Sequence, residues 1–522
     1  MSQFIRVGSV IGQGGGGEWR CISASGKCEI ITFLHRAPFL DSRDLPGGFM
    51  PDCHPVSLPV SITTACRPTA RERRFTLALV AIGMFMAVLD TTIVNVALPA
   101  MRANLGATVA ALAWIVDAYT LSFAALILAG GALSDRFGAK HVYLAGLALF
   151  VAASAGCGFA PSVAVLVAAR FVQGMGAALF LPASLAVVRS TFDVPAERAR
   201  AIAVWAGIAS VAVAVGPVLG GVLVDDFGWR SAFLINVPTG AVALAGAAVL
   251  VRASVARHAR QFDWAGQCVG AIALGALCFA VIELPTRGPG AAEVRGALLV
   301  AGLAAGALVI IERRARDPMV PLAWFRNRTF VAMNLMGSLV YVGYFGLLFV
   351  LSLYLHGRFG MSARQTGLTL LPFALSLSLG NLLSGKLQGR VHPVRLMANG
   401  LGMAALAMPA LAAALTLRAP WPVAWAAMAA FGTGTALSVA PMIATVLEQV
   451  PADAAGVASG FLNAARQAGS LFGVAIASAA TILLPNPTAA LWAIAAVGCI
   501  AYATAALAAR TAGTARAAQR RG

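Results

Sequence analysis

Apolar residues fill most of this chain in runs of about twenty, separated by short polar or charged breaks. A helix needs roughly 20 apolar residues to cross a bilayer, so each run is long enough to span one. The runs are too long and continuous for the short alternating segments of a barrel, which favours helices. The pattern predicts an all-α polytopic membrane protein with fourteen spans, at residues 75–97, 111–130, 141–160, 163–186, 201–223, 231–251, 264–284, 296–312, 329–355, 366–385, 394–416, 423–447, 460–484 and 488–509.

Composition and charge agree with this pattern. Hydrophobic residues make up 59% of the chain and charged residues 11%, about half the charge of a typical soluble domain. The net charge of +18 could indicate a nucleic-acid partner, but Lys and Arg gather in alternate loops, as the positive-inside rule requires of a cytoplasmic side. We therefore expect no nucleic-acid binding, an inner (cytoplasmic) membrane location and both termini in the cytoplasm.

Residues 1–70 contain no apolar run long enough for a span or a signal peptide, and they predict a disordered N-terminal extension, with Met50 as an alternative start of the chain. Gly12, Gly14 and Gly17 match a dinucleotide-binding pattern formally, but no strand precedes them, so a flexible linker is expected. The eight cysteines have no metal-site spacing, and we expect no metal site.

Two segments of the chain echo each other. GALSDRFGAK begins at Gly131 and GKLQGRVHPV begins at Gly385, an offset of 385 − 131 = 254 residues. Six helices plus two inserted ones account for that offset, and parallel halves of this kind are typical of one class of secondary transporters. The predicted organisation is therefore an extension at 1–70, a six-helix bundle at 71–252, a two-helix insert at 253–316, a second six-helix bundle at 317–510 and a cytoplasmic tail at 511–522.

The loop between the second and third spans has its own physical logic. We expect Gly131 to allow close approach of a neighbouring helix, Asp135 and Arg136 to place opposite charges at the membrane edge, Gly138 to form a tight turn, and Lys140 to lie on the cytoplasmic side. The order G-x-L-x-D-R-x-G-x-K resembles the hallmark loop of the major facilitator superfamily. That resemblance implies a gating role, with Asp135 and Arg136 latching the cytoplasmic gate.

Other segments narrow the resemblance to fourteen-helix drug/proton antiporters of the EmrB/QacA type. LDTTIVNVALP at 89–99 is similar to their first-helix signature, and ARFVQGMGAA at 169–178 to their fourth-helix motif. GPVLGG at 216–221 is similar to the antiporter element of helix 5, which the family associates with export and with preventing leak. Its glycines, Gly216, Gly220 and Gly221, also suit plain helix packing, and Pro217 removes one backbone donor and bends the helix.

The second half departs from the family pattern. Gln388 and Gly389 stand where the echo of the hallmark loop would carry an acid, and the tenth span has no acid between Thr366 and Leu383. These departures place a second gating carboxylate in doubt and weaken the expectation of dicationic drugs as substrates.

Few charges lie inside the spans. An Asp at a helix centre costs about 2.5 to 3.5 kcal/mol to insert, so such charges mark function by default. They are Asp90, Asp117, Arg170, Arg466 and, near the outer end of the seventh span, Glu283. An acid whose access to water alternates can be protonated on one side of the membrane and release its proton on the other.

The resemblance makes Arg170, with Gln173 one turn further on, the counter-charge in proton exchange. The alternative for Arg170 is a structural hydrogen bond to carbonyls of the first helix. Two hypotheses remain for the proton carrier: Asp90 itself, or Asp117 with Asp90 holding Asn95 and Arg170 in place.

Three further expectations concern the remaining charges. Asp117, near the outer end of its helix, could simply be wet rather than a proton carrier. Glu283 is expected to be solvated, and Arg466 to be a structural or gating residue of the second half.

Together these features predict a proton-coupled antiporter that exports a hydrophobic drug or antibiotic by alternating access. The alternative is a major facilitator transporter for uptake or exchange of a metabolite. We expect no enzyme, because paired catalytic groups and known catalytic motifs are absent from the sequence. No cofactor is expected beyond the proton as coupling ion. The expected partners are the hydrophobic substrate and the lipid bilayer, and a periplasmic adaptor protein is a further candidate. A functional monomer is expected.

Overall fold

The computed structural model describes residues 69–252, 263–315, 321–451, 454–484 and 486–519, with side-chain surroundings up to residue 510. Within the first 68 residues it describes two strands, β1 (Trp19–Ile22) and β2 (Cys28–Ile31), which pair antiparallel. These strands differ from the disorder expected of the whole extension, because both are rich in residues that favour strands. The rest of the predicted extension lies outside the described residues.

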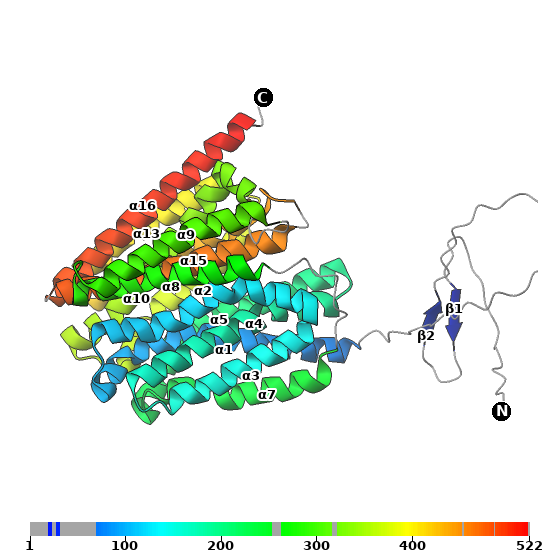
Figure 1. The fold of residues 1–522 in the computed structure, drawn as a ribbon, viewed down its shortest axis with the longest axis horizontal. Helices are drawn as coiled ribbons and strands as arrows, with labels where there is room; N and C mark the ends of the chain where they lie inside the picture. The colour runs from blue at the N-terminus through cyan, green and yellow to red at the C-terminus, as the bar shows by residue number, and fades with distance from the viewer. Residues whose placement is uncertain are drawn as a thin grey trace, which may run out of the picture. The chain divides into compact units, whose positions relative to one another are not determined.

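The chain divides into two units, Met1–Thr69 and Ala70–Gly522. The second unit is built from helices (Figure 1). They are α1 (Ala70–Leu105), α2 (Val109–Phe137), α3 (Ala139–Gly158), α4 (Val163–Thr191), α5 (Pro195–Phe227), α6 (Ser231–Leu234), α7 (Asn236–Leu250), α8 (Trp264–Arg287), α9 (Ala292–Arg314), the 3-10 helix η1 (Leu322–Arg326), α10 (Arg328–Phe359), α11 (Ala363–Thr369), α12 (Leu371–Leu387), α13 (Pro393–Thr416), α14 (Trp421–Leu447), α15 (Ala455–Leu483) and α16 (Pro487–Gln519).

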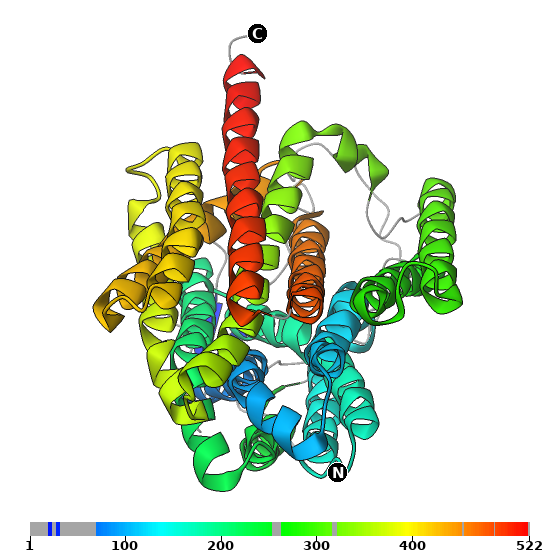
Figure 2. The ribbon, with the colours of Figure 1, turned by 90° about the vertical axis from the view of Figure 1, so that its left-hand side faces the viewer.

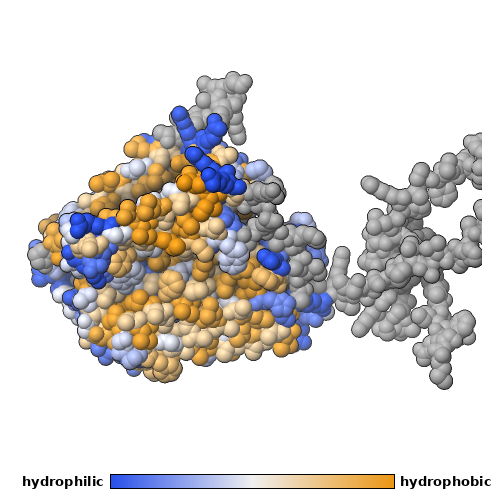
Figure 3. Space-filling model, viewed as in Figure 1, coloured by the Kyte–Doolittle hydropathy of each residue, from blue (hydrophilic) through white to orange (hydrophobic). Residues whose placement is uncertain are grey.

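The fourteen predicted spans all fall on these helices, with α6 and α7 forming one span and α11 and α12 another. In the described part of the chain, 13 helical segments are long and apolar enough to cross a membrane. The remaining span is α15, whose 29 residues include Asn463, Arg466 and Gln467. Hydrophobic side chains cover most of the face seen in Figure 3, and hydrophilic side chains gather toward its ends. The prediction of a polytopic helical protein is confirmed.

The two halves repeat the same helix packing. In the N-terminal half, α4 packs on α2 and α3, and α5 packs on α1. In the C-terminal half, α14 packs on α12 and α13, and α15 packs on α10. Helix α1 ends at Leu105 and α10 ends at Phe359, again 359 − 105 = 254 residues apart. The offset read from the sequence therefore relates whole helices as well as the two loops.

The two inserted helices lie at one side of the bundle (Figure 2, green). Helix α8 packs on α2 and α15, and α9 packs on α8. Because α2 belongs to one half and α15 to the other, α8 covers the seam between the halves at that position.

The two ends of the bundle are named as follows. The far end is the one at which α1, α5 and α10 end and α11 begins; the near end is the opposite one, at which α1 begins. In Figure 1 the helices of the two halves converge toward the left, which is the far end, and spread apart toward the near end.

Candidate functional site

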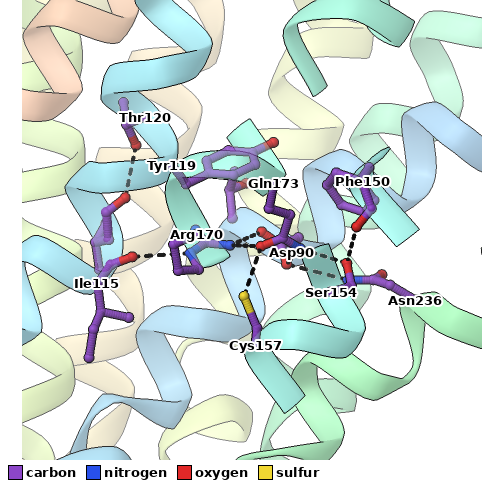
Figure 4. A network of polar contacts seen from close by, with 12 residues as sticks. Asp90, Ile115, Tyr119, Thr120, Phe150, Ser154, Cys157, Arg170, Gln173 and Asn236 are labelled. Atoms are coloured by element: carbon purple, nitrogen blue, oxygen red, sulfur yellow. Dashed lines mark hydrogen bonds and ion pairs between the residues drawn. The ribbon is translucent and has the colours of Figure 1, made fainter. Parts of the chain in front are cut away.

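An ion pair joins α1 to α4 inside the N-terminal half. The Arg170 guanidinium donates to an Asp90 carboxylate oxygen at 2.5 Å, and the two side chains are 1% and 0% exposed (Figure 4). Charges this deeply buried are tolerated only when they are paired and hydrogen-bonded. The predicted counter-charge of Asp90 is therefore in place.

Gln173 completes this pair. Its Oε1 accepts from Arg170 Nη1 at 2.7 Å, while its Nε2 donates to Asp90 at 2.9 Å and to the Ser154 hydroxyl at 2.8 Å (Figure 4). Asn236 of α7 donates to the same carboxylate oxygen of Asp90 at 3.4 Å. The network thus ties α1, α3, α4 and α7 together, and any change in the charge of Asp90 acts on all four helices.

A third set of contacts fixes the Arg170 side chain. Its Nε donates to the carbonyl of Ile115 at 3.0 Å, and its guanidinium lies 4.4 Å from the centre of the Tyr119 ring. The structural alternative named the first helix as the source of a carbonyl acceptor. The acceptor in fact lies on α2, because the first helix offers Arg170 a carboxylate instead.

Asn95 does not join this network. Its side-chain nitrogen donates to the carbonyl of Thr91 in its own helix at 2.8 Å, and its backbone oxygen accepts from Ser352 of α10 at 2.6 Å. Asn95 therefore links the two halves through its backbone, and Asp90 does not hold its side chain.

Asp117 is fully buried, and neither of its carboxylate oxygens has a hydrogen-bond partner among the described residues. The expectation that it could be wet near the outer end of α2 is wrong, because α8 covers α2 there. Leu121, one turn further along α2, lies under Gly275 of α8. The two buried acids therefore have different surroundings: Asp90 lies inside a polar network, and the described residues place no such network around Asp117.

Glu283 is also less solvated than expected, since its side chain is 14% exposed. It accepts from the Trp114 indole at 3.0 Å and from Arg287 at 2.8 Å. Glu283 thus anchors the inserted helix α8 to α2.

The predicted gating loop lies between α2 and α3. Gly138 has φ = +86°, so the tight turn there is confirmed. Asp135 and Arg136 are exposed, and no ion pair of either is found within the described part of the chain. Lys140 donates to the carbonyl of Ala248 in α7 at 2.8 Å. The latch formed by Asp135 and Arg136 stays a prediction.

The role expected of Gly131 is wrong. A Cβ atom at Gly131 would meet nothing within 4 Å, whereas one at Gly130 would lie 2.0 Å from the carbonyl oxygen of Ala178 in α4. The close approach exists, but it falls one residue earlier, because Gly130 is the residue that faces α4.

The glycines of α5 do serve close packing. A Cβ at Gly216 would lie 2.0 Å from the Thr92 hydroxyl oxygen of α1, and one at Gly221 would lie 2.6 Å from the carbonyl oxygen of Ala363 in the other half. Gly220 packs similarly on Ile93. The carbonyl oxygen of Pro217 itself faces Gly367 of α11. This motif is therefore part of the contact between the halves at the far end.

Sequence reasoning missed the polar contact beside it. Asp225 of α5 accepts from the Ser362 hydroxyl at 2.6 Å and from the backbone N–H groups of Ala363 and Arg364 at 3.0 and 2.9 Å. Asp226 pairs with the Arg364 guanidinium at 2.6 Å. The available signal was the capping box at 362–365, which predicts a helix start whose free N–H groups attract an anion. The partner acids could not be identified without the fold.

Arg466 lies in α15, where its guanidinium donates to the Tyr341 hydroxyl of α10 and stacks on that ring at 4.6 Å. Gly337 of α10 packs against its side chain. Arg466 therefore joins the two helices that pack together in the C-terminal half.

These arrangements agree with what the chain is similar to. The family model described as Major Facilitator Superfamily matches residues 80–474. The chain belongs to the major facilitator superfamily. Membership accounts for the repeated halves and identifies the chain as a transporter rather than an enzyme.

Among curated members of the superfamily, the chain is 36% identical to the multidrug resistance protein Stp of Mycobacterium tuberculosis, over 78% of this chain and 75% of that protein. It is 37% identical to the methylenomycin A resistance protein of Bacillus subtilis, over 77% and 86% of the two chains. It is 34% identical to the tetracenomycin C resistance and export protein of Streptomyces glaucescens, over 77% and 74%.

Solved structures of other transporters share the fold. A POT family transporter in complex with 5-aminolevulinic acid superposes with a TM-score of 0.64 at 14% identity, covering 82% of this chain and 94% of that one. The xylose transporter XylE superposes with a TM-score of 0.55 at 16% identity, covering 82% and 97%. At these identities the likeness shows the fold alone.

Proposed function

We propose that this major facilitator protein is a proton-coupled antiporter of the fourteen-helix EmrB/QacA type, which exports a hydrophobic drug or antibiotic. The observation that carries the proposal is the buried Asp90–Arg170 pair, held by Gln173 at the centre of the N-terminal half. Relatives named for drug resistance and for antibiotic export support the substrate class.

The pair offers a physical route to coupling. Protonating Asp90 removes its charge and leaves Arg170 buried without a counter-ion, which is strongly unfavourable. The four helices tied to Asp90 then gain by rearranging, so proton binding and conformational change are linked. Asp117 is the second candidate. It is buried with no hydrogen-bond partner in the part of the chain that the structure describes, and such a site tolerates the neutral form of the acid.

The positive-inside rule gives the direction. Lys and Arg are richest in the near-end loops, and this supports a cytoplasmic near end, cytoplasmic termini and an inner-membrane location. The Asp225–Ser362 and Asp226–Arg364 contacts then close the outer side. Protons would act from that side on Asp90 or Asp117, and their entry would return the outward-facing form. An adaptor protein and a monomeric state are further proposals that the resemblance supports.

The test uses everted membrane vesicles from an efflux-deficient host that expresses the chain. A respiration-driven proton gradient is established, and a panel of hydrophobic antibiotics is added in turn. We expect one or more of them to be taken up and to release part of the gradient, with Asp90→Asn expressed at equal level as the inactive control. Uptake that survives collapse of the gradient, or a gradient that no antibiotic disturbs in a host that the chain makes resistant, would contradict proton antiport.

A further inference from the structure

The C-terminal half contains an interior cation with no carboxylate beside it. Within the described residues, Arg466 has no ion pair within 4.0 Å, and its buried Nε atom has no hydrogen-bond partner. The polar side chain that it contacts is Tyr341. A guanidinium carries five N–H donors, and among the described residues one of them, on Nη2, donates to a side chain of the protein.

The sequence explains why no counter-ion is near. Residues 321–522 contain 13 Lys and Arg residues but two acids, Glu448 and Asp453, and both lie between α14 and α15. Helix α15 begins at Ala455, after both acids, and Arg466 lies 11 residues, or about 16 Å of helix, beyond that start. None of the helices α10 to α16 carries an Asp or Glu.

A cluster of aromatic side chains adjoins this cation through Tyr341. Tyr341, on which Arg466 stacks, lies 5.6 Å from Phe345, and Phe345 lies 4.7 Å from Tyr344 between ring centres. Arg466, Tyr341 and Phe345 are partly exposed, whereas Tyr344 and the adjoining Phe373 are buried. The cation and two rings can therefore be reached by a ligand, and the buried rings support them from behind.

The repeat shows what this cluster replaces. Tyr344 stands 344 − 90 = 254 residues after Asp90, so by the offset of the two halves it takes the place of the buried acid. The N-terminal half therefore has a neutralised pair at this position, and the C-terminal half has an aromatic cluster beside a cation that no acid of the described residues neutralises. A small apolar cavity of about 10 Å³, no larger than one water needs, adjoins Tyr344 and Phe373.

We propose that Arg466, Tyr341 and Phe345 bind the acidic group of the transported molecule, and that the substrate is an apolar or aromatic compound carrying a carboxylate or a similar anion. This inference rests on the proposed function and deepens it. A guanidinium recognises a carboxylate through paired hydrogen bonds, and the rings offer flat apolar surface to the body of the same molecule. The interior-negative membrane potential also drives an anion outward, which suits an exporter.

Asp117 is the other anion that Arg466 could meet. It lies on α2, which packs against α15, and it is the N-terminal interior acid for which the described residues offer no hydrogen-bond partner. In this structure the two are not paired, and that arrangement favours a ligand as the partner of Arg466. Pairing with Asp117 is therefore an outcome that the test must be able to show.

The test is equilibrium binding to the full chain in phosphatidylcholine nanodiscs, without any gradient. The probes are anthracene-9-carboxylate, 9-anthracenemethanol and 9-(aminomethyl)anthracene, which share one ring system and differ in charge. Binding is followed by probe fluorescence, with empty nanodiscs as the reference for partition into lipid. We expect the carboxylate to bind about tenfold more tightly than the alcohol, as hydrogen bonds to charged groups allow, and the amine to bind most weakly.

Variants separate a binding role from a structural one. Arg466→Gln should remove the preference for the carboxylate and leave the affinity for the alcohol within about twofold, and Arg466→Lys should keep part of it. Arg358→Gln, which changes an exposed arginine of α10, should have no effect.

Equal binding of all three probes by the unaltered protein would overturn the proposal. An Arg466→Gln variant that keeps the preference for the carboxylate, or that binds all three probes more weakly to the same degree, would overturn it as well. If Arg466 pairs with Asp117 instead, the unaltered protein should show no preference for the carboxylate and the Asp117→Asn variant should show one. That result would also overturn the proposal. Because no gradient is used, charge-selective binding without export in vesicles would contradict the proposed function while confirming Arg466 as an anion-binding site.

Discussion

Arg170 and Asp90 form a 2.5 Å ion pair in which neither side chain is more than 1% exposed. Taking two charges out of water costs several kcal/mol for each ion, and their attraction offsets this only when the remaining polar atoms are also satisfied. Gln173 satisfies both partners at once. The pair is therefore stable as a unit and intolerant of losing one member, which is the behaviour expected of a protonation switch.

The first prediction follows from that asymmetry. Asp90→Ala should lower the free energy of unfolding by about 3–5 kcal/mol, because it leaves Arg170 buried and unpaired. Asp90→Asn should cost less, since the amide oxygen can still accept from Arg170. Both variants should lose proton-driven efflux. Thermal unfolding of the protein in nanodiscs and efflux from vesicles measure the two effects.

A double variant gives the control for this prediction. Asp90→Asn combined with Arg170→Gln removes both charges and should regain most of the stability lost in the single variants, without regaining transport. Arg189→Gln, at the exposed end of α4, should leave both properties unchanged. Additive losses in the double variant would mean that the two side chains are not coupled.

The second prediction concerns glycine contacts. A Cβ at Gly367 would lie 2.0 Å from the carbonyl oxygen of Pro217, and real Cβ atoms keep at least 3.0 Å, so Gly367→Ala must move α11 away from α5 by about 1 Å. Gly130→Ala should likewise separate α2 from α4. Gly131→Ala, within the family motif, should be tolerated because nothing lies within 4 Å. Efflux activity at equal expression distinguishes these three variants, and a Gly131→Ala variant as inactive as Gly130→Ala would show that another conformation packs that residue.

The helical architecture could be predicted from the sequence because it depends on a local property, the length of apolar runs. The repeat offset of 254 residues is also confirmed, since the same offset relates the ends of α1 and α10. The pairing of Asp90 with Arg170 could not be predicted from apolar runs. It was predicted only because two separate motifs resemble those of one family. Periodicity alone does not say which helices touch.

The errors have physical causes of the same kind. Gly130 and Gly131 are adjacent, and which of them faces α4 depends on a helix rotation of about 100° that composition does not reveal. Asp117 and Glu283 were expected to be near water because of their depth along the helix. Helix α8 covers Asp117, and Glu283, which lies on α8 itself, is turned toward Trp114 of α2. The position of an inserted helix is a tertiary property, so this burial could not be predicted from the apolar pattern of the chain.

The third prediction concerns closure of the far end. Asp226 and Arg364 are 44% and 46% exposed, so their ion pair should contribute about 0–1 kcal/mol to the closed form. Asp225 holds three hydrogen bonds at the start of α11 and should contribute more. Asp225→Asn should therefore shift the protein toward the form open at the far end by more than Arg364→Gln does. Spin labels on the ends of α5 and α11 report the shift as a longer distance.

The charge-reversed pair is the control for this closure. Either single reversal should lengthen the distance between the spin labels. The double variant, Asp226→Arg with Arg364→Asp, should return it to the value of the unaltered protein, because the attraction is the same with the signs exchanged. A distance distribution that no variant changes would mean that the glycine contacts alone hold the far end closed.

The fourth prediction separates Asp117 from Asp90. Both oxygens of Asp117 lack a partner among the described residues, so Asp117→Asn removes no hydrogen bond seen in this structure, and the free energy of unfolding should change by less than about 1 kcal/mol. If Asp117 carries a proton through the cycle, this variant should move fewer protons per substrate, measured as the ratio of proton flux to substrate flux in proteoliposomes. Asp193→Asn, at an exposed position after α4, provides the matched control. An unchanged ratio in Asp117→Asn would assign the coupling to Asp90 alone, whereas a large loss of stability would show that Asp117 has a partner in another conformation.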